Sequence, residues 1–321
     1  MSEPLFERLA LIGVGLIGSS IARAARACGA ARSIVATARS AATRRRAAEL
    51  GLADELTATN AAAVKDADLV ILCVPVGQSG AIAAEIGPHL KSGAIVSDVG
   101  SVKAQVARDM APHLPAGIHF VPAHPVAGTE YSGPDAGFAE LFVNRWCILT
   151  PPEHADPAAV ERLSAFWQAL GSSVETMSAE HHDLVLAITS HVPHLIAYTI
   201  VGTADDLETV TRSEVMKFSA GGFRDFTRIA ASDPTMWRDV FLANREAVLE
   251  MLGRFNEDLA ALARAIRWAD GDALFDLFTR TRAVRRGIVE LGQDSGAPDF
   301  GRTHAPLPLA PLPRPYAADG E

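Results

Sequence analysis

The most constraining feature of this chain is a glycine-rich segment near its N-terminus, GVGLIG at residues 13–18. It follows a short apolar run, Leu9–Ile12, and opens an Ala-rich stretch with helical spacing, Leu16–Cys28. In such a strand–turn–helix unit the first glycine makes a tight turn, the second lets a pyrophosphate approach the backbone, and the third lets helix and strand pack closely. The phosphates meet the N–H groups at the helix start. We therefore predict a dinucleotide site that includes Gly13, Gly15, Leu16, Ile17 and Gly18.

Apolar runs typical of buried strands alternate with helix-like segments through the first half of the chain. The predicted strands are residues 9–12, 33–36, 69–74, 94–99, 118–121, 146–149 and 173–176, and the predicted helices are 16–28, 41–50, 76–90, 102–113 and 157–170. This alternation is typical of parallel βαβ units with helices on both faces of the sheet. The predicted fold is an α/β, doubly wound Rossmann sheet.

After Met177 the pattern becomes helical without a clear strand. We expect helices at 181–203, 237–262 and 271–291. A length of 321 residues favours two domains. We place a Rossmann domain at 1–177, an all-α domain at 178–293, and a proline-rich, disordered tail at 294–321 that contains PLPLAPLPRP.

Charge and cysteine content narrow the classes of partner. The formal net charge is −9, so no broad basic face is expected, and we predict neither nucleic acid nor a membrane surface as partner. The three cysteines are far apart in sequence, which favours neither a disulfide framework nor a metal site. We see no signal peptide and no apolar stretch long enough to span a bilayer. A cytoplasmic location is the expectation.

The segment after the second predicted strand bears on the choice of cofactor. NAD sites usually carry Asp or Glu there to bind the ribose diol. Here residues 35–40 read VATARS, without an acid, and Arg39 and Ser40 suit a 2′-phosphate. Arginines at 44–46 add positive charge, although a solvated helix face explains most of that run. The pattern favours NADP over NAD, with Val74 and Pro75 expected at the same edge of the sheet.

Histidines in two segments suggest the reaction. His124 begins HPVAGTE, which we expect to form a loop at the carboxyl end of the fifth predicted strand. A histidine there suits acid–base chemistry because it titrates near neutral pH. A loop histidine bonded to backbone is the alternative. SHVPH at 190–194 interrupts an apolar helix with a proline, which predicts a kink. No acidic partner motif accompanies its two histidines, so we predict no metal.

A second polar cluster, GGFRDFTR at 221–228, lies in the helical half. The paired glycines suggest a shaped loop, and an arginine in it can grip a carboxylate with two parallel hydrogen bonds. A helix-capping loop with a surface ion pair is an equal alternative on composition.

Taken together, these motifs resemble the prephenate/arogenate (cyclohexadienyl) dehydrogenase family of tyrosine biosynthesis. The matching stretches are GVGLIGSS at 13–20, DVGSVK at 98–103, HPVAGTE at 124–130, SHVPH at 190–194 and GGFRDFTRIAASDPTMW at 221–237. The resemblance implies a Rossmann domain followed by a helical dimerisation domain of the 6-phosphogluconate-dehydrogenase-like plan, and hence a homodimer. It also implies NAD(P)-dependent oxidative decarboxylation of prephenate or arogenate, driven largely by aromatisation of the ring.

The resemblance also implies residue roles. His124 would polarise the substrate hydroxyl as a general base, with Ser101 holding that hydroxyl or the histidine. His194 would contact the substrate with support from His191, and Arg228 would bind a carboxylate. The residues expected to form the polar network and gate around the pocket are Glu130, Asp225 and Trp237.

Several alternatives stay open at this point. The sequence does not distinguish prephenate from arogenate, or show whether tyrosine inhibits at the active site or which site residues come from the second subunit. A 3-hydroxyacid dehydrogenase or imine reductase of the same plan would often rely on a lysine of the helical domain. The one lysine there, Lys217, lies outside the His/Pro helix, which disfavours this reading, whereas Lys103 keeps it open. A dinucleotide-sensing protein without activity is a third possibility, which the presence of His124, His194 and Arg228 disfavours.

Overall fold

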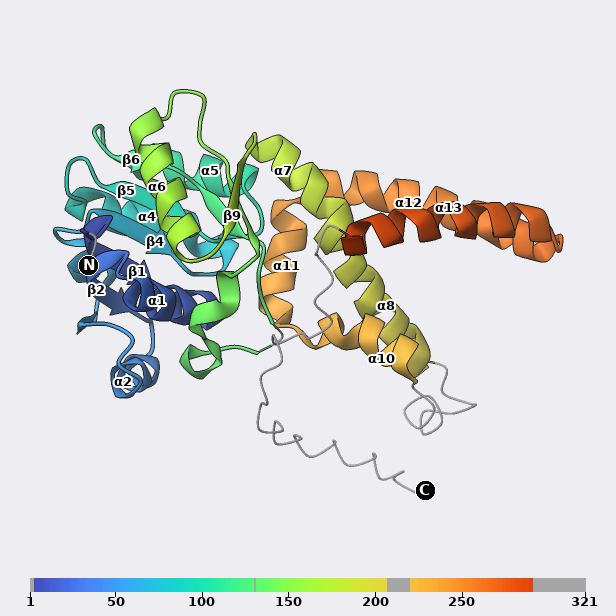
Figure 1. Ribbon diagram of the computed structural model, residues 1–321, viewed down its shortest axis with the longest axis horizontal. Helices are drawn as coiled ribbons and strands as arrows, with labels where there is room; N and C mark the ends of the chain where they lie inside the picture. Colours follow the sequence, from blue (N-terminus) through green and yellow to red (C-terminus); the bar gives the residue numbers. More distant parts are fainter. Residues whose placement is uncertain (1–2, 130, 207–219, 291–321) are drawn as a thin grey trace, which may run out of the picture. The chain divides into compact units, whose positions relative to one another are not determined.

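The structure is a computed structural model that describes residues 3–129, 131–206 and 220–290 (Figure 1). The chain divides into two compact units, Met1–Leu274 and Phe275–Glu321, and the candidate site lies in the first. Glu130, Lys217 and the predicted tail at 294–321 lie outside the described residues.

The described elements match most of the predicted ones. The strands are β1 (Phe6–Ile12), β2 (Ala31–Thr37), β3 (Glu55–Thr57), β4 (Leu69–Leu72), β5 (Ile95–Asp98), β6 (His119–Phe120), β7 (Ala123–Pro125), β8 (Trp146–Leu149) and β9 (Ser173–Thr176). The helices are α1 (Leu16–Cys28), α2 (Ala41–Glu49), α3 (Asn60–Val64), α4 (Ser79–Ile86), α5 (Ala104–Met110), α6 (Pro157–Ala169), α7 (Ala179–Leu186), α8 (Val192–Asp206), α10 (Gly221–Thr227), α11 (Pro234–Ala243), α12 (Arg245–Arg267) and α13 (Gly271–Glu290).

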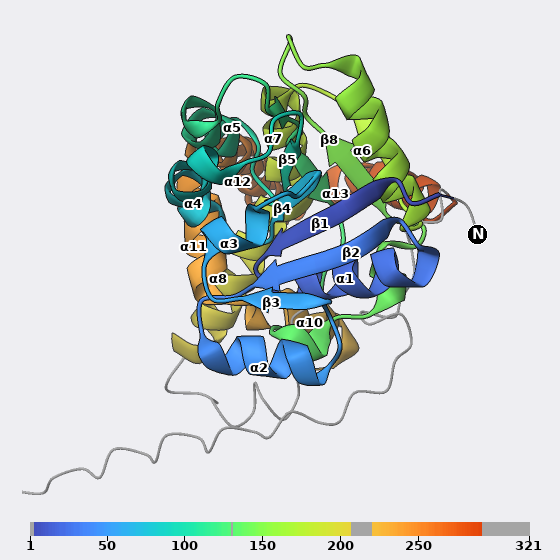
Figure 2. The same ribbon diagram turned by 90° about the vertical axis from the view of Figure 1, so that its left-hand side faces the viewer.

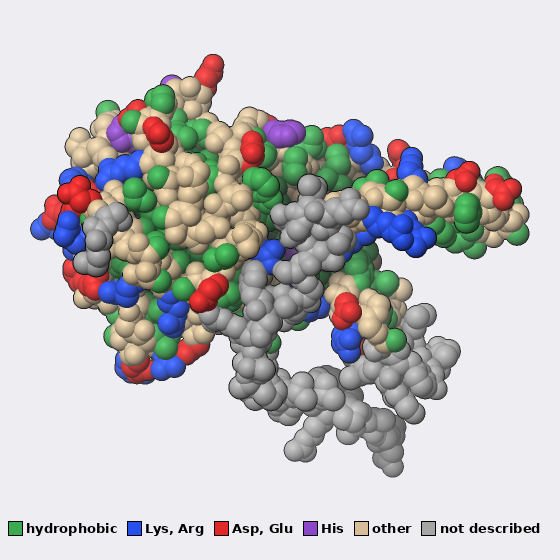
Figure 3. Space-filling view, viewed as in Figure 1, with side chains coloured by type: hydrophobic (Ala, Val, Ile, Leu, Met, Phe, Trp, Pro, Cys, Tyr) green, Lys and Arg blue, Asp and Glu red, His purple; other side chains and the backbone are tan. Residues whose placement is uncertain are grey.

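The main sheet is wholly parallel, with strand order β3-β2-β1-β4-β5-β6 (Figure 2). This is the doubly wound Rossmann order, as predicted. Every residue of β4 is buried, as expected where helices cover both faces of a sheet. Because all the strands run the same way, the segments that follow β1, β2, β4 and β5 meet at one edge, which is the usual ligand edge of such folds. Acidic and basic side chains are interspersed over the Rossmann part on the face seen in Figure 3.

A second sheet, β7-β8-β9, stands beside the first. Its strand β7 contains His124, so the prediction of a loop at this position was wrong. The backbone there pairs antiparallel with β8, with His124 opposite Ile148. The N–H of Ala123 also faces a carboxylate oxygen of Asp98 at 3.4 Å, which ties β7 to the end of β5. Strand pairing therefore fixes the backbone of His124.

The helix predicted at 181–203 is part of a continuous helix from Ala179 to Asp206, made of α7, a π-helical segment η6 (Ala187–His191) and α8. The π-helical turn lies just before Pro193, whose missing N–H disturbs the regular hydrogen-bond ladder. The helix is 28 residues long and apolar enough to cross a membrane by length and composition, so the expectation that no stretch reaches that length was wrong. Two of its polar residues, His182 and Asp183, are nevertheless buried against the Rossmann part of the unit.

The helix predicted at 237–262 is two helices, because the chain bends at Asn244 between α11 and α12. The buried side chain of Asn244 turns away from solvent and donates to the carbonyl oxygen of Asp183 at 2.8 Å. Asparagine forms helices poorly and readily bonds to backbone groups, which explains a break at this residue.

Candidate active site

The glycine loop between β1 and α1 has the geometry that a pyrophosphate requires. Gly13 has a φ of +101°, and a Cβ there would collide with the carbonyl oxygen of Cys73. A Cβ at Gly18 would collide with the carbonyl of Gly13, so these two glycines serve close packing. A Cβ at Gly15 would meet nothing within 4 Å. The open space over Gly15, at the uncapped N-terminus of α1 that begins with Leu16 and Ile17, fits a bound phosphate.

The end of β2 presents basic and hydroxyl groups. Arg39 is exposed, and its side chain makes no hydrogen bond or ion pair with any residue that the structure describes. Ser40 caps α2 by accepting a hydrogen bond from the N–H of Thr43 at 2.9 Å. Arg44 donates to the carbonyl oxygens of Ala38 and Arg39, at 2.5 and 3.1 Å, and so keeps its charge beside this turn.

Arg46, in contrast, is occupied elsewhere. Its guanidinium makes hydrogen bonds of 2.6 to 3.2 Å with the carboxylate of Asp135 and also contacts Glu49. It therefore ties α2 to the segment after β7. The loop after β4 adjoins the glycine loop, since the Cγ1 of Val74 lies 3.3 Å from where a Gly13 Cβ would be, and the half-buried Val74 and Pro75 line this edge of the sheet.

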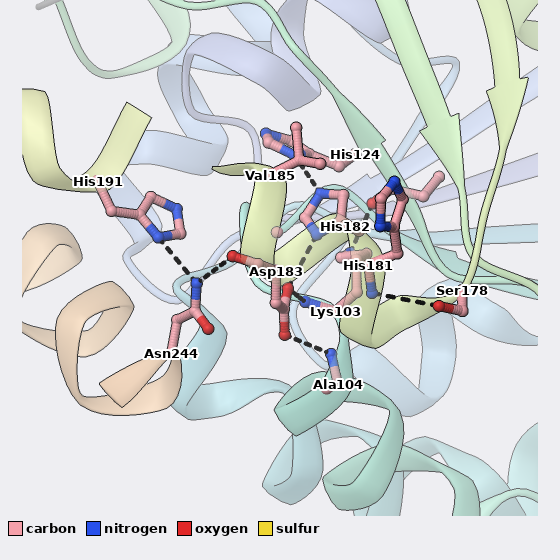
Figure 4. Close-up of polar contacts among 12 residues, drawn as sticks. Lys103, Ala104, His124, Ser178, His181, His182, Asp183, Val185, His191 and Asn244 are labelled. Atoms are coloured by element: carbon pink, nitrogen blue, oxygen red, sulfur yellow. Dashed lines mark hydrogen bonds and ion pairs between the residues drawn. The ribbon is translucent and has the colours of Figure 1, made fainter. Parts of the chain in front are cut away.

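Behind the sheet edge, His124 heads a chain of buried polar contacts (Figure 4). Its Nδ1 lies 2.8 Å from the Nε2 of His182, and the two rings meet edge to face. The Nδ1 of His182 lies 2.8 Å from an oxygen of Asp183. Neither His182 nor Asp183 was predicted as a site residue. The signal available in the sequence was a His-Asp pair inside an otherwise apolar helix.

Asp183 also holds the start of α5. Its carboxylate accepts hydrogen bonds from the N–H groups of Lys103 and Ala104, at 2.8 and 2.9 Å (Figure 4). This places a negative charge at the N-terminus of a helix, where the backbone N–H groups favour it. The carboxylate thereby joins the helical part of the unit to the loop that follows β5.

Lys103 is fully buried. Its Nζ lies 2.5 Å from an oxygen of Asp98 and donates to the carbonyl of Ala123 at 2.6 Å. Burial lowers its pKa and the Asp98 charge opposes that effect. A side chain enclosed in this way cannot reach a substrate, which disfavours the lysine-dependent alternatives that Lys103 had kept open.

The buried imidazoles are neutral at neutral pH. Burial lowers the pKa of His124 well below its usual value, and the nearby His182, Lys103 and His191 lower it further. Burial likewise lowers the pKa of His182, against the hydrogen bond to Asp183 that raises it. A neutral imidazole held at the ligand edge of a Rossmann sheet can accept a proton, which is what a general base must do.

His191 lies deeper in the same cluster. Its Nδ1 is 3.1 Å from the side-chain nitrogen of Asn244, which thus links it to Asp183. Burial lowers the pKa of His191 to about 4, with the backbone of Ser101 acting in the opposite direction. The half-buried Ser101 therefore lies between the end of β5 and His191. Asn244 was not foreseen from the sequence.

His194 and Trp237 stack face to face. Their ring centroids are 3.6 Å apart and the planes are inclined by 24°. His194 also contacts the carbonyl of Ser190, and its pKa is lowered by burial and, more weakly, by the charge of Arg228. The indole nitrogen of Trp237 is buried and has no hydrogen-bond partner among the described residues. The structure thus brings together His194, Trp237 and Arg228, three residues that the sequence analysis assigned to the same site.

Asp225 is placed differently. The segment 221–227 is the helix α10 and not the shaped loop we expected, because the two glycines begin a helical turn. There the exposed Asp225 forms an ion pair with the adjacent Arg224, at 3.2 Å. Among the residues that the structure describes, no cluster of three or more His, Cys, Asp or Glu is arranged to hold a metal ion.

The fold and the site together define a dinucleotide-dependent oxidoreductase, with a Rossmann sheet for the cofactor and a helical part that adds buried histidines beside it. The family descriptions that match are "Prephenate dehydrogenase, nucleotide-binding domain" over residues 21–176 and "Prephenate dehydrogenase, dimerization domain" over residues 178–280. The chain therefore belongs to the prephenate dehydrogenase family.

Individual relatives agree with this assignment. A cyclohexadienyl dehydrogenase of Zymomonas mobilis is 46% identical over 284 residues, covering 88% of this chain and 97% of the relative. A prephenate dehydrogenase of Bacillus subtilis is 33% identical over 306 residues, covering 95% and 82%. Among solved structures, prephenate dehydrogenase from Aquifex aeolicus in complex with hydroxyphenyl propionate and NAD+ has a TM-score of 0.82 at 33% identity, covering 88% and 98%. Synechocystis arogenate dehydrogenase has a TM-score of 0.74 at 27% identity, covering 87% and 99%.

Proposed function

We propose that this chain catalyses the NAD(P)-dependent oxidative decarboxylation of prephenate, arogenate or both, with His124 as the base that takes the substrate hydroxyl proton. The observation that carries the proposal is the buried imidazole of His124, which strand pairing with β8 holds beside the end of β5. The nicotinamide supplies an acceptor for the hydride that leaves the ring carbon bearing the hydroxyl. Loss of carbon dioxide then makes the ring aromatic, and the ring oxygen, now a phenolate, takes the proton back from His124.

The protein's own groups position the substrate and move one proton. As the carbinol C–H bond breaks, the hydroxyl oxygen becomes a carbonyl and its proton passes to the free ring nitrogen of His124. Ser101 holds the hydroxyl or the base. Arg228 binds a carboxylate, and His194 contacts the substrate with its ring fixed by the Trp237 stack. The unpartnered indole N–H of Trp237 is a donor for a substrate oxygen.

Other roles rest on the family resemblance alone. We assign His191 to the support of His194. Asp225 and Glu130 are assigned to the polar network around the pocket, with Glu130 outside the described residues and Asp225 on an exposed helix.

We propose NADP as the preferred cofactor. The turn after β2 lacks the acid that binds a ribose diol, and it offers the exposed Arg39, the hydroxyl of Ser40 and the nearby charge of Arg44. A 2′-phosphate would satisfy these groups, whereas a bare diol would leave Arg39 without an anion.

The first experiment is the initial rate of nicotinamide reduction, measured by absorbance, with prephenate and arogenate each tested against NAD and NADP. We expect turnover of at least one substrate and faster turnover with NADP. His124→Asn should lower kcat by about 10²–10⁴-fold with little change in dinucleotide affinity. Folded protein that binds a dinucleotide but turns over neither substrate would contradict the proposal.

We propose further that the chain is a cytoplasmic homodimer through its helical part. The match to a dimerisation domain at residues 178–280 supports this, as do the exposed apolar side chains of α12, among them Leu259 at 51% and Ile266 at 66% exposure. Sedimentation of Leu259→Glu should show dissociation. Ala261→Glu introduces the same charge about 200° around the helix and serves as the matched control. A dimeric Leu259→Glu variant would exclude this face.

A further inference from the structure

Two buried residues next to the proposed base have no part in the reaction as described so far. The side chain of His182 is 0% exposed and Asp183 is 5% exposed as a residue. They come from the start of α7, whereas His124 comes from β7. Figure 4 shows the three side chains in line, from Asp183 through His182 to His124.

We propose that His182 and Asp183 are positioning residues which form a hydrogen-bonded triad with His124, fix its tautomer and stabilise the imidazolium that forms when the substrate hydroxyl loses its proton. The inference rests on the proposed role of His124 as base. It adds two residues from the helical part of the unit to the proton chemistry of a base that lies in the sheet.

The hydrogen-bond partners determine where the protons lie in the triad. Asp183 accepts two backbone N–H bonds, from Lys103 and Ala104, and therefore serves as an ionised acceptor. The Nδ1 of His182 must then carry a hydrogen and donate it to Asp183. Its Nε2 is left with a lone pair, which accepts the Nδ1–H of His124. The remaining nitrogen of His124, Nε2, consequently has the lone pair that a base needs.

The surrounding charges match the charge that the reaction creates. Asp98 and Asp183 are anionic and Lys103 is cationic, which leaves one net negative charge around the neutral imidazoles. Proton transfer to His124 adds one positive charge and brings the cluster to neutrality. In a buried site this balance offsets much of the cost of enclosing an imidazolium.

The other titratable groups near His124 do not change this balance. Burial raises the pKa of the Cys147 thiol on β8 well above its usual value, so it stays neutral. Burial lowers the pKa of His191 to about 4, so its ring is also neutral at neutral pH.

Replacement of His182 tests the triad, with two variants of different hydrogen-bonding capacity. His182→Phe keeps a planar ring of similar size and removes the acceptor for His124. His182→Gln is the matched control, because its carbonyl oxygen can accept the same hydrogen bond. In 15N-labelled protein at pH 7.5, NMR should show His124 as the Nδ1–H tautomer in the wild type and His182→Gln. In His182→Phe we expect the Nε2–H tautomer and a kcat lowered by about 10²–10⁴-fold, with KM and dinucleotide affinity unchanged.

A second variant covers the case in which His182→Phe does not fold. Asp183→Asn removes the negative charge and keeps one oxygen, which can accept the N–H of Lys103 while the bond to Ala104 is lost. The imidazolium of His124 then becomes less stable, so the acidic limb of the kcat/KM profile should move to lower pH. A merely structural residue would leave that limb in place.

The failure of this inference can be told apart from failure of the proposed function. The NMR measurement requires no turnover, so an inactive wild type would contradict the function and still report the tautomer. An Nε2–H tautomer of His124 in the wild type would overturn the triad. So would a His182→Phe variant with wild-type tautomer and kcat, or an unmoved acidic limb in Asp183→Asn.

Discussion

Replacing Lys103 by methionine should destabilise the protein far more than loss of a surface lysine. Lys103→Met leaves the carboxylate of Asp98, 2% exposed, with two remaining donors, the N–H groups of Gly100 at 2.8 Å and Ala123 at 3.4 Å. Removing one partner of a buried ion pair costs about 3–5 kcal/mol. Because Asp98 keeps two N–H donors, we expect a loss of unfolding free energy near the lower end of this range, about 3 kcal/mol. The carbonyl oxygen of Ala123 also loses its hydrogen bond from Lys103, which adds about 1 kcal/mol.

A total loss of about 4 kcal/mol corresponds to a fall in Tm of about 6 °C for a chain of 321 residues, at an unfolding entropy of about 2.1 cal/mol/K per residue. Circular dichroism during thermal unfolding, at one fixed protein concentration, measures the change. Lys91→Met is the matched control, because Lys91 pairs with Asp68 at the same 2.5 Å distance but its side chain is 49% exposed. That variant should lose no more than about 1 kcal/mol.

The double variant Lys103→Met with Asp98→Asn tests the cause. It removes both charges and should recover a large part of the lost Tm, because no unpaired buried charge remains. A Lys103→Met protein within about 1 kcal/mol of the wild type, as little as an exposed pair is worth, would refute the reasoning. A double variant less stable than Lys103→Met would refute it as well.

Three further predictions concern the cofactor and the base. Gly15→Ala should keep the wild-type Tm but bind dinucleotide weakly in a fluorescence titration, because a Cβ there meets open space in the protein. Gly18→Ala should lower the Tm, because a Cβ there meets backbone. Equal effects of the two variants on Tm would contradict this. Because burial lowers the pKa of His124, its imidazole stays neutral at neutral pH. The value of kcat/KM should therefore fall only as the pH drops below about 6.5. An acidic limb of the kcat/KM profile centred above that pH would contradict the assignment of His124 as base. Arg39→Ala should raise the KM for NADP and leave that for NAD nearly unchanged, and equal losses would exclude a 2′-phosphate contact.

The sheet order and the cofactor loop were predictable because local patterns determine them. The glycine spacing and the alternation of apolar runs with helical segments both act over a few residues, and both appear in β1, α1 and β4 as expected. The short strand β7 was not predictable in the same way. Its three residues carry no strand pattern of their own, and pairing with β8, more than 20 residues later, makes them a strand.

The sequence singled out some residues of the buried polar cluster and missed others. His124, His191, His194 and Trp237 lie in motifs that single them out by sequence. Asn244, in contrast, lies in a stretch that looks helical throughout, and its importance comes from contacts with Asp183 and His191, 61 and 53 residues away. Contacts at such separation depend on the packing of helices, which local spacing does not encode.

The carboxylate of Asp183 binds the N-terminus of α5 and a histidine of its own helix at once, and this has a consequence for how such enzymes can be recombined. A chimera that joins this sheet to the helices of a relative would keep His124 and exchange the groups that support it. The proton affinity of His124 in the chimera would then depend on the protein that supplied the helices and not on the protein that supplied His124. Under the proposed triad, the pH range of catalysis would change by exchange of the helices, with no substitution at His124.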